Sequence, residues 1–380
     1  MADLYDYIKW RGDLSFKQDA VNDVDLACLC QLAVLNAQDL WEDKNLTLKE
    51  AFDLFAQSGR ASEPQGVIIP FDANILFKQM SECARFKDAR LSHYVYYAKK
   101  DQKTQFCAMR FDLGTDNVVC FSGTDDTIVG WEENFILIND KPTYAQTQAQ
   151  KYLKSATEEL PDLIVAGHSK GGNLAMYSFL HAGTKAAKKI KLCLCIDAPG
   201  VSQADFDTPV FDKYGYKLRS LAPQSSIIGR LFVHKESVTV TKSAATGLYQ
   251  HDCFSWAVSG KNFVTTDSFT EQSDKIDNLI KNILSDMDAE TRQNFVRAVF
   301  GMLYSTNSLT LTQLQTKRAS LLSQYLKLNK ADKKLLNGVV ADLIKEPAVR
   351  HMFFANLKQM RLSKTADEKK QSEFSRQLST

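Results

Sequence analysis

The sequence has no long apolar run, and its charges nearly cancel. The longest apolar stretch, Leu26–Leu35, is about ten residues long and is interrupted by Gln31, whereas a membrane-spanning helix needs about 18. Forty-seven basic residues against 45 acidic ones leave a net charge of +2, which is too small for the basic surface of a nucleic-acid-binding protein. We therefore expect neither an integral membrane segment nor a nucleic acid partner.

The sequence also lacks a secretory start and the cysteine spacing of metal sites. The chain begins Met1-Ala2-Asp3-Leu4-Tyr5-Asp6, with acids where a signal peptide has basic residues followed by an apolar run, so we expect a cytoplasmic protein. None of the eight cysteines forms a Cys-x-x-Cys pair, and we expect reduced, buried thiols. Because His, Asp and Glu do not cluster at ligand spacing either, we expect no metal and no organic cofactor.

The middle of the chain alternates short apolar segments with helical patterns. The expected strands are 93–99, 105–113, 117–122, 163–166, 190–196, 216–221 and 237–241, and the expected helices between them are 144–159 and 172–182. Such alternation predicts an α/β fold with a mainly parallel sheet that is covered by helices on both faces.

The end of the chain is different, because strand patterns stop near Phe269. Apolar residues at helical spacing predict helices over 274–287, 289–304, 311–328 and 331–344. We predict three parts: an α/β domain (1–270), a helical subdomain (271–362) and a polar, frayed tail (363–380). The apolar helix faces must pack against one another or the sheet, form a homodimer, or cover the site as a lid.

One strand-to-helix junction carries a catalytic signature. Leu163–Ala166 runs into Gly167-His168-Ser169-Lys170-Gly171, after which small and apolar residues open a helix. A serine on such a strained turn needs neighbours without side chains two positions before and after it, and the glycines provide them. We predict Ser169 as a nucleophile; the alternative is a glycine-rich turn with an incidental serine.

A serine nucleophile needs a base, and the chain has only six histidines. His251 lies C-terminal to the elbow, in Gln250-His251-Asp252 and just before an apolar run. This chain order is the one that α/β-hydrolases use. We predict His251 as the base, with His234 as the competing candidate.

The third group must orient the histidine. The carboxylates between Ser169 and His251 are Asp197, Asp205, Asp207, Asp212 and Glu236. Asp197 alone follows a buried strand, 190–196, and catalytic groups of α/β sheets collect at such strand ends. We predict that Asp197 accepts a hydrogen bond from His251; the alternative is that it only caps the turn at Pro199-Gly200.

Acyl transfer also needs donors for the developing oxyanion. One is expected to be the backbone amide of Lys170, directly after the nucleophile. The second is expected to be the amide of Thr124, because a strand ends there in Phe121-Ser122-Gly123-Thr124. An ordinary turn is the alternative for this loop.

These motifs resemble a known group of hydrolases. Phe121-Ser122-Gly123-Thr124 with Trp131, and the elbow through Ala175, are similar to signatures of class 3 lipases. The lysine after the serine, the opening 5–13 and the segment 250–252 look closer to the bacterial Mbeg-like hydrolases, a family of unknown function related to those lipases. The resemblance covers about residues 1–260. It implies an α/β-hydrolase fold with the nucleophile, base and oxyanion roles given above.

The sequence departs from class 3 lipases in the position of the acidic residue that orients the histidine. Class 3 lipases carry it in a later loop, which here corresponds to Ala222–Gly229 and contains no carboxylate. Pancreatic-type lipases place it one strand earlier, in a context similar to Ile196-Asp197-Ala198-Pro199, which favours Asp197.

We therefore predict a serine carboxylic-ester hydrolase, esterase- or lipase-like, that acts on a small-molecule ester through an acyl-enzyme. The alternatives are a thioesterase or acyltransferase, or a catalytically degenerate hydrolase fold that serves as a binding module.

Overall fold

A nine-stranded sheet forms the centre of the computed structural model, which describes residues 1–64, 66, 72–137, 141–350 and 369–378. In spatial order its strands are β1 (Leu46–Thr47), β2 (Arg90–Lys99), β3 (Thr104–Asp112), β4 (Asn117–Phe121), β5 (Leu163–His168), β6 (Ile190–Ile196), β7 (Leu218–Pro223), β8 (Ser237–Thr241) and β11 (Thr265–Thr266). Two further short strands, β9 (Val258–Ser259) and β10 (Asn262–Phe263), pair with each other.

The sheet is mixed, with a parallel centre. Strands β4 to β8 run parallel to their neighbours, whereas β1–β2–β3–β4 and β8–β11 pair antiparallel. The first two expected long strands, 93–99 and 105–113, are present as the antiparallel pair β2–β3. Because strands β4 to β8 are parallel to one another, their carboxyl ends meet at one edge of the sheet, where catalytic groups are expected.

The helices precede, interrupt and follow the sheet. Before β2 lie α1 (Leu4–Arg11), α2 (Asp23–Leu32), α3 (Gln38–Trp41), α4 (Leu48–Gln57) and α5 (Asp72–Glu82), with the short strand β1 between α3 and α4. Between its strands lie α6 (Ile128–Ile136), α7 (Tyr144–Glu159), α8 (Lys170–Leu180), α9 (Thr184–Lys189), α10 (Gln203–Phe206) and α11 (Pro209–Tyr214). After it come α12 (Glu271–Ser285), α13 (Ala289–Tyr304), α14 (Leu311–Gln315), α15 (Arg318–Lys327) and α16 (Lys330–Lys345). The 3₁₀ turns are η1 (Arg60–Ser62), η2 (Gly215–Lys217), η3 (Ile228–Arg230), η4 (Gly247–His251) and η5 (Cys253–Ser255).

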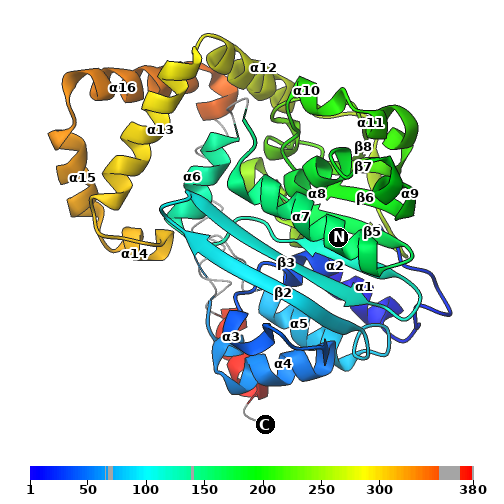
Figure 1. The fold of residues 1–380 in the computed structure, drawn as a ribbon. Coiled ribbons are helices and arrows are strands. Elements are labelled where there is room, and N and C mark those ends of the chain that lie inside the picture. Colours follow the sequence, from blue (N-terminus) through cyan, green and yellow to red (C-terminus); the bar gives the residue numbers. More distant parts are fainter. Residues whose placement is uncertain (65, 67–71, 138–140, 351–368, 379–380) are drawn as a thin grey trace.

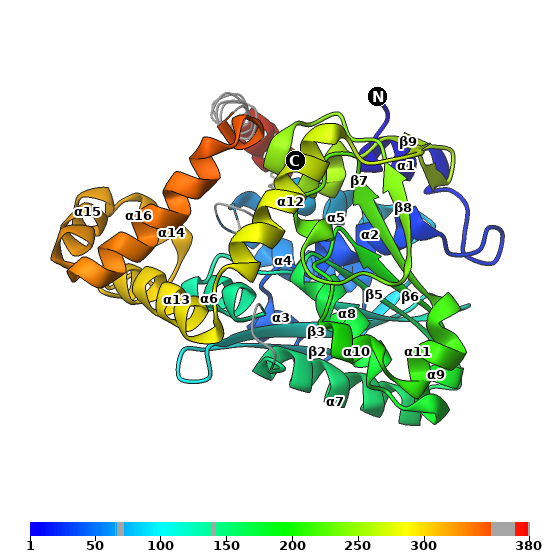
Figure 2. The ribbon, with the colours of Figure 1, turned by 90° about the horizontal axis from the view of Figure 1, so that it is seen from above.

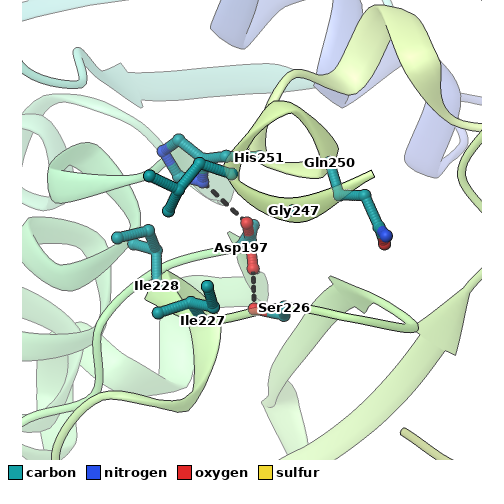
Figure 3. A pocket seen from close by; sticks show the side chains of 8 residues that line it. Asp197, Ser226, Ile227, Ile228, Gly247, Gln250 and His251 are labelled. Carbon is teal, nitrogen blue, oxygen red and sulfur yellow. Dashed lines mark hydrogen bonds and ion pairs between the residues drawn. The ribbon is translucent and has the colours of Figure 1, made fainter. Parts of the chain in front are cut away.

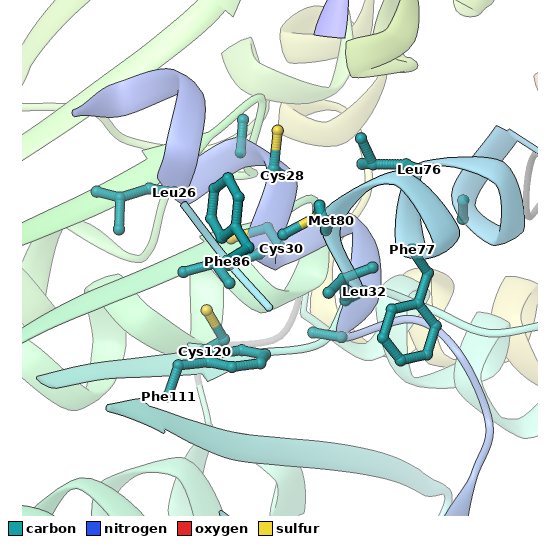
Figure 4. Close-up of a cluster of buried hydrophobic side chains, with 14 of the residues drawn as sticks. Leu26, Cys28, Cys30, Leu32, Leu76, Phe77, Met80, Phe86, Phe111 and Cys120 are labelled. Atoms are coloured by element: carbon teal, nitrogen blue, oxygen red, sulfur yellow. The ribbon is translucent and has the colours of Figure 1, made fainter. Parts of the chain in front are cut away.

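Helices cover both faces of the sheet, as the sequence predicts (Figure 1). Adjacent strand residues point to opposite faces, so Val165 and Ala166 of β5 belong to two different hydrophobic clusters. One cluster packs α1, α2 and α5 against the sheet, and the other packs α7, α8 and α9. Figure 4 shows side chains of α2 and α5 in the first cluster next to Phe111 and Cys120 of the sheet. The eight cysteines are free thiols, and seven of them are buried.

The C-terminal helices α12–α16 extend from one side of the sheet, next to α6 (Figure 2). Val296 and Phe300 of α13 pack against Ile128 of α6. The single helix expected over 311–328 is divided into α14 and α15, with Lys317 between them outside helical geometry. Its ammonium group donates to the carbonyls of Thr306 and Asn307, which ties the break to the preceding turn. Within the described residues, no helix is both long and apolar enough to cross a membrane.

The end of the chain differs from the expected frayed tail. Residues 369–378 form a helix, and Phe374 is buried in the cluster that also contains α1 and α5. Lys370 pairs with Asp72 at 2.5 Å. An aromatic anchor and an ion pair thus hold a segment whose polar composition favours disorder. The predicted boundary at 362/363 lies outside the described residues.

Candidate active site

The elbow around Ser169 joins the end of β5 to the start of α8. Ser169 has φ 58° and ψ −129°, a strained conformation for a residue with a side chain. A Cβ on Gly167 would lie 2.2 Å from the backbone of Gly171, and one on Gly171 would lie 2.1 Å from the carbonyl oxygen of Phe121. No side chain fits at either position, so both glycines are required by the close approach of the backbone.

His251 and Asp197 are brought together at the same edge of the sheet (Figure 3). His251 Nδ1 lies 2.6 Å from Asp197 Oδ2, and the Asp197 side chain is 1% exposed while that of His251 is 27% exposed. Because a carboxylate can only accept, the imidazole proton is on Nδ1 and the lone pair is on Nε2. This is the tautomer that a general base needs.

Asp197 is itself held by the loop that follows β7. The hydroxyl of Ser226 and the amide of Gly229, 3.1 Å away, both donate to Asp197 Oδ1. This loop is the segment 222–229 that lacks a carboxylate of its own. It thus supplies donors to an acid that comes from the end of β6.

His168 contributes a contact that the sequence reasoning did not assign. Its ring lies 4.5 Å from that of His251, centroid to centroid, and its Nε2 lies 2.8 Å from the carbonyl oxygen of His251. Burial, with a smaller contribution from the charge on His251, lowers the pKa of His168 to about 3. A neutral His168 therefore anchors the His251 loop to the elbow. A histidine directly before the nucleophile is the only sequence signal for this role.

The Ser169 hydroxyl makes no hydrogen bond to His251 in the part of the chain that the structure describes. Such contacts are often long in an enzyme without substrate and shorten in the Michaelis complex. The stacking of His168 on His251 nevertheless places the imidazole beside the elbow.

The predicted oxyanion loop lies against the elbow. A Cβ on Gly123 would be 3.5 Å from Ser169 Cβ and 3.1 Å from the carbonyl oxygen of His168. Next to it, Thr124 Oγ1 accepts a 2.8 Å hydrogen bond from Asn134 Nδ2. The loop is therefore fixed at its hydroxyl and is close to the nucleophile at its glycine.

The competing residues have other partners. His234 Nδ1 lies 2.7 Å from Glu236 and its Nε2 lies 3.2 Å from the carbonyl of Leu231, so both ring nitrogens are engaged. Asp205 pairs with His181 at 2.9 Å. Among the carboxylates between Ser169 and His251 in the chain, the structure brings Asp197 to His251.

A buried ion pair lies directly after Ser169 in the chain. The side chain of Lys170 is 1% exposed and pairs with Glu133. The described residues contain no group of three or more His, Cys, Asp or Glu side chains placed to hold a metal ion.

Comparison with known proteins identifies a family and only weak structural similarity. Similar solved structures include M37 lipase (14% identity, TM-score 0.33, covering 54% of this chain and 67% of that one) and the Rhizomucor miehei lipase propeptide complex (14% identity, TM-score 0.34, covering 57% of this chain and 67% of that one). Similarity this low carries no argument about chemistry. No curated protein matches the chain. The family described as Mbeg1-like matches residues 80–301, which is more than half of the sequence, and the chain therefore belongs to the Mbeg1-like family.

Proposed function

We propose that this protein is a serine ester hydrolase that works through an acyl-enzyme. The observation that carries the proposal is the 2.6 Å contact of His251 Nδ1 with the buried carboxylate of Asp197, next to an elbow that holds Ser169 at positive φ. A strained serine, an oriented imidazole and a buried acid are the groups that acyl transfer requires.

In the proposed reaction, Ser169 Oγ attacks the ester carbonyl and His251 Nε2 accepts its proton. The backbone amides of Lys170 and Thr124 bind the oxyanion of the tetrahedral intermediate. His251 then gives the proton to the leaving alcohol, and the acyl group stays on Ser169. A water molecule, deprotonated by His251, attacks the acyl group, and the bond to Ser169 Oγ breaks as His251 returns the proton to that oxygen, which releases the carboxylic acid and restores the starting state.

The residues beside His251 support an apolar substrate. Ile227 and Ile228 lie next to Asp197 and His251 (Figure 3). Leu248 lines the same pocket and is 47% exposed. An exposed leucine beside a catalytic pair favours contact with an apolar acyl or alcohol group. Thioesters and acyl transfer to another alcohol use the same apparatus, so the substrate panel has to include them.

The test is covalent labelling followed by turnover. A fluorophosphonate probe should label the wild-type protein and fail to label Ser169→Ala, since the probe reacts with an activated serine. On p-nitrophenyl esters of increasing chain length, Ser169→Ala should lose on the order of a millionfold in kcat, with an unchanged circular dichroism spectrum. Activity of Ser169→Ala within tenfold of wild type would contradict the assignment of the nucleophile. A folded wild-type protein that is neither labelled nor active would favour the binding-module alternative.

The remaining proposals concern organisation. We propose that residues 1–270 form the hydrolase domain and that the helices from 271 onwards form a subdomain of a cytoplasmic protein. Leu322, Leu326, Val340 and Ile344 are each more than half exposed on α15 and α16, which is compatible with a homodimer through these helices. Light scattering after size-exclusion chromatography tests the dimer.

A further inference from the structure

The lysine that follows the nucleophile has an unusual environment. Lys170 Nζ donates to the carbonyl oxygen of Gln105 at 2.6 Å and to the side-chain oxygen of the same residue, and lies 3.3 Å from Glu133 Oε2. The side chains of Lys170 and Glu133 are each 1% exposed. Removing two charges from water is costly, and an apolar pair of similar volume often stabilises a fold at least as well. Stability alone therefore does not account for this pair.

Glu133 connects α6 to two further elements. Its Oε1 accepts from the Thr104 hydroxyl at 2.8 Å and from the amide of Ala145, at the start of α7, at 3.1 Å. Its Oε2 accepts from the amide of Gln105 at 3.1 Å. The carboxylate is thus fixed by β3 and α7 before it meets Lys170, which makes it a rigid anchor.

The same helix also holds the opposite side of the proposed oxyanion hole. Asn134, the next residue of α6, donates its 2.8 Å hydrogen bond to Thr124 Oγ1. Two consecutive residues of α6 therefore hold the two residues whose backbone amides are the proposed oxyanion donors, Lys170 and Thr124.

We infer that the buried Lys170–Glu133 ion pair positions the backbone amide of Lys170 relative to the backbone amide of Thr124, the second proposed oxyanion donor. The inference rests on the proposed function. Lys170 thus acts twice, through its amide as a donor and through its side chain as the tie that keeps α8 in register with α6. Because the oxyanion forms only in the transition state, loss of the tie should lower kcat and leave KM nearly unchanged.

The first test compares Lys170→Met with a matched control. Removing an oxyanion donor costs about 10²–10³ in kcat, and a displaced donor should cost less, roughly 10- to 100-fold, with KM within about threefold. The fluorophosphonate titre supplies the concentration of active sites, so a loss of folded protein is not counted as a loss of turnover. Arg110→Met removes another largely buried cation. Arg110 lies on β3, the strand that also bears Gln105, and pairs with Glu159. It should lower the melting temperature and keep kcat per titrated site.

The second test separates positioning from folding. Lys170→Met alone leaves Glu133 buried without its cation and can fail to fold. The double variant Lys170→Met/Glu133→Leu removes both charges, so its melting temperature should approach that of wild type while kcat stays low. A trifluoromethyl ketone inhibitor, which forms a tetrahedral adduct with serine, should bind more weakly by the same factor as kcat/KM falls.

Two outcomes would overturn this inference and leave the proposed function standing. One is a folded double variant with wild-type kcat per titrated site, and the other is inhibitor affinity that stays constant while turnover falls. A wild-type protein that is neither labelled nor active would instead overturn the proposed function and this inference together.

Discussion

The substitution Asp197→Asn tests the site most sharply, because the structure fixes which way the new amide must face. Asp197 Oδ1 accepts from the Ser226 hydroxyl and from the amide of Gly229. Ser226 Oγ in turn accepts from the same amide at 2.9 Å, so its hydroxyl proton is directed at Asp197. An asparagine therefore keeps its oxygen on this side and presents its NH₂ group to His251 Nδ1.

The size of the effect follows from this orientation. Because the NH₂ group of asparagine donates to Nδ1, the proton of the neutral imidazole must be on Nε2. Nε2 can then no longer accept a proton from Ser169. The carboxylate that stabilises the imidazolium is also lost. A substitution of this kind in a Ser-His-Asp triad costs about 10⁴ in kcat. We expect a loss between about 10² and 10⁴, which corresponds to roughly 2.7–5.4 kcal/mol of transition-state stabilisation.

The assay is steady-state hydrolysis of a p-nitrophenyl ester, with thermal unfolding followed in parallel. Asp252→Asn is the matched control, because Asp252 is a half-buried acid that adjoins His251, yet its carboxylate accepts from the amide of Phe254. It should keep kcat within about threefold. If Asp197→Asn folds and retains more than a tenth of wild-type kcat, or if Asp252→Asn loses as much as Asp197→Asn, the assignment of Asp197 is wrong.

Two further predictions concern stability. Burial is the main cause that raises the pKa of Asp252 from 3.8 to about 7. The folded protein therefore holds a proton that the unfolded chain releases between about pH 4 and pH 7. As pH rises through that window, the free energy of unfolding falls by up to about 1.4 kcal/mol per pH unit. Asp252→Asn should therefore raise the melting temperature more at pH 8 than at pH 5, and an equal change at both pH values would contradict this. Deleting the chain after Ser268 should give aggregating protein, because it uncovers the apolar surface of α6 around Ile128 and removes Phe374 from the core. A soluble, monomeric and fully active truncation would show that the C-terminal helices are an independent module.

The sequence by itself determines the features whose partners are near neighbours in the chain. Thr47 and Glu50 form a capping box, and Asp288 and Asn329 are N-caps, each through a side chain that meets a backbone amide three residues away. The nucleophile elbow belongs to the same class, because the positive φ of Ser169 and the glycines beside it are requirements of one turn. In the caps, and in the contact of Gly167 with Gly171, the interacting groups are three or four residues apart, so the pattern contains the information that decides the geometry. The close approach of the Phe121 carbonyl oxygen to Gly171 is different, because Phe121 is distant in the chain.

The pairing of Asp197 with His251 follows from the fold class together with the position of Asp197 at a strand end. A carboxylate at the end of a buried strand is a reasonable partner for a histidine far along the chain, since strand ends of a parallel sheet gather at one edge. The pairing of Asp197 with His251, which are 54 residues apart, can therefore be predicted from the sequence. The hydrogen bonds from Ser226 and Gly229 cannot, because they depend on how the next loop folds back over the strand end.

Only the tertiary structure decided which long side chains are buried and against what. A lysine after the nucleophile is expected in water, because lysines are almost never fully buried unless they are paired, and its partner Glu133 lies 37 residues away on another helix. In the same way, polar composition predicts a frayed C-terminus, yet Phe374 enters the core beside α1 and α5. Local patterns set backbone conformation within a turn or two. Burial and charge pairing depend on packing between segments that are distant in the chain, so they are decided only when the whole chain has folded.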